Sequence, residues 1–71
     1  MERKTFLELC QQAAVYPSNN IKVRFAKYCY TPHGYKLTFD SAGHAVHTAI
    51  LIDKERNCYM YAVLDKVEEV K

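Results

Sequence analysis

The most constraining feature of this chain is the stretch from Ala45 to Val63, which contains two apolar segments separated by a charged one. Residues 45–52 are rich in β-branched side chains and residues 58–63 in aromatic ones, and both compositions are typical of β-strands. The polar residues between them end on Asn57, a residue type that tolerates the left-handed backbone of tight turns. The stretch therefore predicts a β-hairpin whose first strand carries apolar side chains on both faces.

A helix is predicted ahead of this hairpin. Thr5 and Glu8 have the spacing of a capping box, in which the two side chains satisfy free amides of the first helical turn. Because Pro17 pushes the preceding residue toward extended geometry, the helix should end near Val15. Such a short helix is not stable alone, so its apolar stripe must pack on the sheet, with Phe6, Leu9 and Ala13 at the contact. The stripe consists of Phe6, Leu9, Cys10, Ala13 and Ala14.

Two more strands are predicted between the helix and the hairpin. Residues 21–25 alternate between apolar and basic side chains, and the alternation changes phase at Ala26. We expect a one-residue bulge there, which would carry the same strand on to Tyr30. Residues 31–34 have Pro at the second position of a turn, and residues 35–39 alternate again as the next strand.

The last segment, residues 64–70, has apolar residues three positions apart. This spacing fits one helical turn or a tight turn at Asp65 and Lys66 followed by a short strand, and the β-branched composition favours the strand. With a turn at residues 40–43, the pattern predicts an α+β fold, in which an N-terminal helix packs on a strongly bent antiparallel meander of four to five strands. A small half-closed barrel is the alternative form. The short length predicts a single domain over residues 1–71.

From Thr48 to Val70 the expected layout is strand, tight turn, strand, abrupt turn and short last strand. This layout resembles the second half of the Sm-like RNA-binding barrels, which also place a helix before a bent five-strand sheet. The resemblance implies a half-closed barrel. It concerns architecture alone, so it assigns no functional residue.

Composition limits the environment of the protein. The net charge of +2 is well short of the Lys and Arg excess of a dedicated nucleic-acid domain. No apolar run reaches the ~18 residues of a membrane span, and the N-terminus lacks the apolar core of a signal peptide, so we expect a cytoplasmic protein without a membrane partner. The odd number and wide spacing of Cys10, Cys29 and Cys58 predict free thiols that are mostly buried as small apolar groups.

The sequence contains no recognisable catalytic or metal-binding motif. His44 and His47 would point to opposite faces of a strand, so they do not form a ligand pair. Gly34 and Gly43 lie in predicted turns and form no phosphate-binding loop. We therefore expect no metal, no cofactor and no enzymatic activity. The less favoured alternative, a small hydrolase or toxin, would use His47 with a cysteine or a tyrosine.

Tyrosine is the most unusual residue type, with six copies in a chain that has no tryptophan. Tyr59 and Tyr61 must project to one face of their strand, while Met60 and Ala62 form a smoother opposite face that suits the helix. We predict that the tyrosines stay on the far side and form an interaction surface. The candidate members are Tyr28, Tyr30, Tyr59 and Tyr61.

Two functions follow from these features. The leading hypothesis is a non-enzymatic protein-interaction module that binds itself, as a dimer or higher oligomer, or another protein, because so short a chain leaves one apolar sheet face uncovered. The runner-up is a small barrel that binds single-stranded nucleic acid by stacking tyrosine rings on bases. In that hypothesis a basic patch neutralises phosphate, and its candidate residues are Lys22, Arg24, Lys27 and Lys36.

Overall fold

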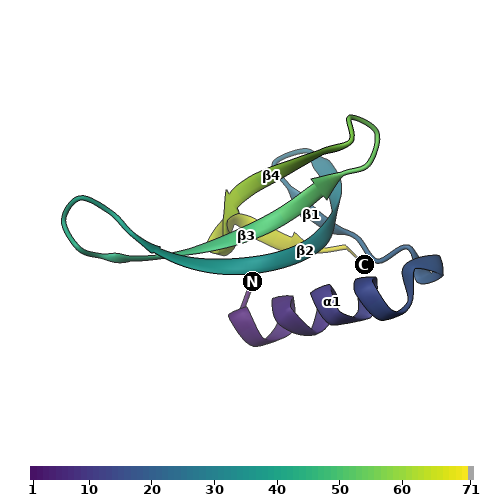
Figure 1. The fold of residues 1–71 in the computed structure, drawn as a ribbon, viewed down its shortest axis with the longest axis horizontal. Helices are drawn as coiled ribbons and strands as arrows, with labels where there is room; N and C mark the ends of the chain where they lie inside the picture. Colours follow the sequence, from purple (N-terminus) through teal and green to yellow (C-terminus); the bar gives the residue numbers. More distant parts are fainter. Residues whose placement is uncertain (71) are drawn as a thin grey trace.

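A computed structural model describes residues 1–70 as one helix and a five-stranded antiparallel sheet (Figure 1). The sheet has the strand order β4-β3-β2-β1-β5 and is not closed, because β4 and β5 each pair with a single neighbour. The predicted α+β architecture is confirmed. In chain order the elements are α1 (Arg3–Val15), the 3₁₀ turn η1 (Pro17–Asn19), β1 (Val23–Phe25), β2 (Tyr28–Phe39), β3 (Ala45–Asp53), β4 (Cys58–Val63), the 3₁₀ turn η2 (Leu64–Lys66) and β5 (Val67–Glu69).

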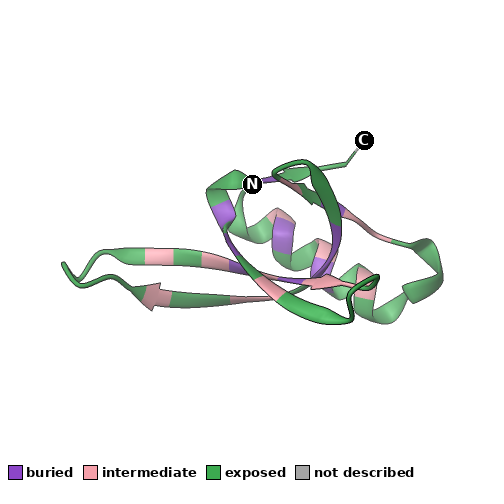
Figure 2. Ribbon diagram, turned by 90° about the horizontal axis from the view of Figure 1, so that it is seen from above, coloured by how far each residue is buried: buried purple, intermediate pink, exposed green. Residues whose placement is uncertain are grey.

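The core lies between α1 and the curved strands of the sheet. Figure 2 shows the buried positions gathered where the helix lies against the curved strands. Phe6 and Cys10 supply the buried part of the helix stripe, and Leu9 packs against the core while partly exposed. Ala13 is half-buried and Ala14 is exposed, so the stripe is narrower than predicted. The sheet contributes Val23, Tyr30, Ala49, Leu51 and Ala62, and the η2–β5 segment adds Leu64 and Val67.

The helix begins earlier than the predicted capping box. Its N-cap is Glu2, which makes no side-chain capping hydrogen bond, and Thr5 lies inside the helix. The Met1 ammonium donates to the Leu64 carbonyl at 3.2 Å and to the Val67 carbonyl at 3.1 Å, which holds the N-terminus against the η2–β5 segment. This contact with the far end of the chain favours a helix start at Arg3. The predicted end at Val15 is confirmed.

The predicted bulge at Ala26 is wrong, because the chain reverses there. Phe25 pairs directly with Tyr28, and Ala26, between them, adopts a positive φ of 58°. The turn predicted at residues 31–34 is also wrong, since that segment lies inside the long strand β2. The pairing of β2 with β3 is irregular between Pro32 and Gly34. The fully buried Pro32 is tolerated there because proline has no N–H to donate to a regular ladder of strand hydrogen bonds.

The remaining elements follow the sequence-based expectation. The β3–β4 hairpin forms as predicted, and the residues after Val63 form a tight 3₁₀ turn and then the short strand β5. This strand pairs with β1, with Phe25 opposite Val67. The meander thus ends by adding its last strand beside its first.

The ends of β2 and β3 form a two-stranded arm that projects beyond the rest of the sheet (Figure 1). Strand β4 accompanies β3 only as far as Thr48, which pairs with Val63. At the tip, the Asp40 carboxylate accepts hydrogen bonds from the Ala42 amide at 3.0 Å and the His44 amide at 2.8 Å. These hydrogen bonds stabilise the turn at the tip of the arm.

Candidate interaction surface

One face of the β3–β4 hairpin is apolar and uncovered. Tyr59 pairs with Ile52, Tyr61 with Ile50, and Val63 with Thr48, so these residues project to the same side of the sheet. Tyr59 is 61% exposed and Tyr61 is 59% exposed, while the two isoleucines opposite them on β3 are half-buried. We call this surface the outer face, and its apolar members are Ile50, Ile52, Tyr59, Tyr61 and Val63.

The opposite face of the same two strands is buried. Ala49, Leu51 and Ala62 alternate with the outer-face residues and belong to the core beside Phe6. Met60 packs against this core and is partly exposed. The structure therefore puts Tyr59 and Tyr61 on the side away from the core, in the arrangement that the alternation predicts.

Two side chains from β2 contact the exposed tyrosine rings. The Lys36 Nζ lies 4.7 Å from the centroid of the Tyr61 ring, a cation–π contact worth roughly 0.5–1 kcal/mol at an exposed site. The His33 ring lies 5.1 Å from the Tyr59 ring, tilted by 50°. His33 lies at the irregularity of the β2–β3 pairing, between Pro32 and Gly34. These contacts restrict the orientations of both tyrosine rings.

Strand β4 is also an edge of the sheet. Its six residues, Cys58–Val63, contain no proline and no formally charged side chain. Natural proteins usually protect such edges with lysine, proline or very short strands. The opposite edge, β5, does so: it has three residues, two of which are glutamate. The two terminal strands of the sheet thus differ, since β5 is protected and β4 is not.

The two other tyrosines that we predicted for this surface lie elsewhere. Tyr30 is 8% exposed and belongs to the core, opposite Val23, so its assignment to an interaction surface is wrong. Tyr28 is 63% exposed but lies at the start of β2. It lines a cavity of about 280 Å³ with residues that include Lys22 and Arg56.

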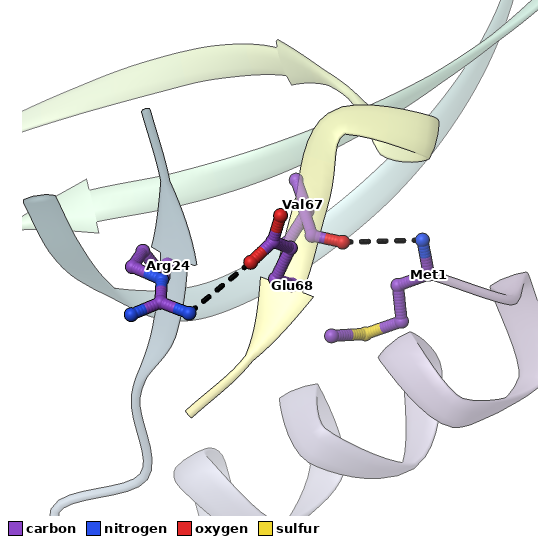
Figure 3. A network of polar contacts seen from close by, with 4 residues as sticks. All are labelled: Met1, Arg24, Val67 and Glu68. Atoms are coloured by element: carbon purple, nitrogen blue, oxygen red, sulfur yellow. Dashed lines mark hydrogen bonds and ion pairs between the residues drawn. The ribbon is translucent and has the colours of Figure 1, made fainter. Parts of the chain in front are cut away.

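The four candidate basic residues do not form one patch. The Arg24 guanidinium pairs with the Glu68 carboxylate at 3.2 Å (Figure 3). The Lys22 ammonium donates to the Thr31 hydroxyl at 3.2 Å and lines a cavity that also contains Asp53 and Glu55. Lys27 is in the β1–β2 turn, and Lys36 lies over Tyr61 near the other end of β2. The positive charges are therefore dispersed and partly neutralised.

The three cysteines occupy two kinds of environment. Cys10 is buried, and burial raises the pKa of its thiol from 9.0 to about 11. Cys29 and Cys58 are exposed, so the prediction that the thiols are mostly buried is wrong for these two. All three are free. Within residues 1–70, no three His, Cys, Asp or Glu side chains converge in a way that could hold a metal ion.

His47, the residue considered for hydrolytic chemistry, contacts a tyrosine on the arm. Its Nδ1 is hydrogen-bonded to the Tyr35 hydroxyl, and the two rings stack at 5.9 Å. The sequence does not single out Tyr35 as the tyrosine beside His47, because the contact runs diagonally across a register in which Leu37 faces His47. Knowing which residues of β2 and β3 lie opposite each other would have indicated this contact.

Comparison with known proteins gives no guide to function: no family model, no curated protein and no solved structure matches this chain. Among residues 1–70 there is no helix with the length and apolar character needed to cross a membrane. The outer face and the β4 edge are therefore the features of the structure that bear on function.

Proposed function

We propose that this protein is a non-enzymatic interaction module that self-associates through β4 and the outer face. The observation that carries the proposal is the row of exposed apolar side chains, Tyr59, Tyr61 and Val63, on an unprotected edge strand. Ile50 and Ile52 extend this row toward the centre of the sheet. A contiguous apolar surface of this kind usually marks a contact site.

The chemistry of the surface supports a protein partner. Tyrosine is enriched at protein interfaces because its ring is apolar and its hydroxyl tolerates a wet rim, whereas charged residues are depleted from interface centres. The outer face follows this composition, with its nearest cation, Lys36, already placed over a ring. Self-association needs no second protein and uses the same exposed residues on both copies.

The runner-up function, binding of single-stranded nucleic acid, has less support. Its four basic residues are separated, and Arg24 is already paired with Glu68. A mild net charge of +2 adds little general attraction for phosphate. Binding of a labelled single strand that weakens steeply between low and high salt would favour this alternative.

We also propose a cytoplasmic location. The three free cysteines support it, because a reducing compartment keeps such thiols unpaired while an oxidising one tends to bridge or modify them. Localisation of a tagged full-length chain by cell fractionation tests this point.

The double substitution Tyr59→Ser and Tyr61→Ser tests the function directly. We expect light scattering to give a mass above the 8.3 kDa chain mass for the parent and the chain mass for the double variant, with unchanged circular dichroism. Tyr28→Ser is the matched control, because Tyr28 is equally exposed and lies outside the outer face. A parent that is monomeric at every concentration would overturn the proposal, and a double variant that unfolds would mean that the two tyrosines belong to the core.

A further inference from the structure

We infer that self-association is a two-fold pairing of β4 with β4 of a second copy, which joins two five-stranded sheets edge to edge. The inference rests on the proposed function and specifies its geometry and its partner. An antiparallel pair of identical strands is isologous, so each copy gives and receives the same contacts and assembly stops at the dimer.

The backbone of β4 is open along one side. Within residues 1–70, β4 pairs only with β3, so the backbone groups along its other side have no strand partner. Six residues without charge or proline provide a regular ladder for another strand. Strand addition at an open sheet edge is a recurring mode of protein recognition.

The two terminal strands of the sheet differ as possible partners for β4 of a second copy. The terminal strand at the other end of the described order, β5, offers only three residues. Glu68 of β5 is paired with Arg24, and the Val67 carbonyl accepts a hydrogen bond from the Met1 ammonium (Figure 3). Pairing β4 with β4 doubles the number of residues in the ladder and avoids placing neutral β4 beside glutamates.

The side chains of β4 also suit pairing with a second β4. A two-fold axis at Met60 puts Tyr59 of one copy opposite Tyr61 of the other, and an axis at Tyr61 puts the two Tyr61 residues opposite each other. Either register brings the tyrosines of both copies together on the outer side. Cross-strand aromatic pairs contribute roughly 0.2–1 kcal/mol each, in addition to the apolar area that they bury. The two outer faces then form one continuous apolar surface.

Site-directed disulfide formation tests this geometry. In a background with Cys10→Ala, Cys29→Ser and Cys58→Ser, one cysteine is introduced at Tyr59, Met60, Tyr61 or Ala62, and each variant is checked for the parental circular dichroism. Equivalent residues separate by about 6.6 Å along the strands for each position away from the axis, because each copy contributes about 3.3 Å per residue. Since bridged cysteines need Cα atoms within about 7 Å, only one or two adjacent positions can bridge.

We expect the dimeric disulfide band to peak at Met60 or Tyr61 and to fall several-fold two positions away. If the parent is a dimer by light scattering and no β4 position bridges, the two-fold pairing is wrong while the proposed function stands. Uniform bridging at all four positions contradicts the pairing as well. A monomeric parent overturns the proposed function itself.

A charge-swap experiment gives an independent readout with the natural cysteines in place. Tyr61→Lys and Tyr61→Glu each put like charges together across the two-fold axis, so each variant alone should be monomeric. An equimolar mixture should regain the dimer mass, because opposite charges then meet. Tyr28→Lys mixed with Tyr28→Glu is the control and should leave the parental mass unchanged. Dimers in the separate Tyr61 variants would overturn the inference.

Discussion

The two faces of the β3–β4 hairpin are built from alternate residues of the same two strands, yet their environments are opposite. Leu51 and Ala62 on the inner face are 0% and 4% exposed, whereas Tyr61, one residue from Ala62, is 59% exposed. Both faces are apolar. The apolar pattern therefore shows that both faces of a strand could be buried. Which face is buried within the chain depends on where a covering element packs.

Residues 1–70 contain one covering element of sufficient length. Helix α1 has 13 residues and lies against the curved strands (Figure 2). Its Phe6 and Cys10 belong to the core together with the inner-face residues. A short helix covers only one side of a curved sheet. The outer face is left to solvent in the monomer, and we propose that a second copy pairs with the open β4 edge beside it.

The largest expected effect lies where helix and inner face meet. Phe6 is fully buried, so Phe6→Ala should lower the free energy of unfolding by about 3–5 kcal/mol, enough to unfold a small domain. Leu9, on the same stripe, is only partly buried, and Leu9→Ala should cost less than Phe6→Ala. Urea denaturation measures both. Equal losses would mean that the helix packs differently from the structure.

The next effect compares the two faces on one strand. Leu51→Ala should cost about 2–5 kcal/mol, because it leaves a cavity in the core. Ile50→Ala, its neighbour on the outer face, should cost less than half as much when measured at concentrations where the protein is monomeric. The same variant should weaken self-association. Equal destabilisation of the monomer by both substitutions would remove the distinction between the faces.

A smaller effect separates the buried thiol from the exposed ones. Burial holds the pKa of Cys10 at about 11, above its ordinary value of 9.0, so the folded protein keeps a proton that the unfolded chain loses. The stabilisation is complete below pH 9 and is lost as pH rises through 11. Stability should therefore fall over this range less in Cys10→Ala than in the parent. Parallel pH profiles for the two proteins would contradict the buried thiol.

Much of the fold follows from local patterns. The helix stripe, the β3–β4 hairpin and the last strand were predicted because each has a clear hydrophobic period or a strong turn signal. The start of the helix was missed because the Met1 ammonium binds carbonyls of Leu64 and Val67, a contact that spans the whole chain. The turn at Ala26 was missed because a positive φ at alanine has no sequence signal.

The site was partly predictable for a similar reason. Alternation along β4 is enough to put Tyr59 and Tyr61 on one face. The difference between buried Tyr30 and exposed Tyr28 depends instead on the register with β1, in which Tyr30 lies opposite the buried Val23. The basic residues do not form a patch, because Lys36 lies over Tyr61 while Arg24 pairs with Glu68 from the last strand.

The most direct test of the account compares amide hydrogen exchange at the two sheet edges as protein concentration rises. We predict that protection of Tyr59–Val63 in β4 increases with concentration, because a second copy covers this strand, while Val67–Glu69 in β5 exchanges at the same rate throughout. Exchange in β4 that is independent of concentration, or protection that increases in β5 instead, would contradict the assignment of β4 as the contact surface.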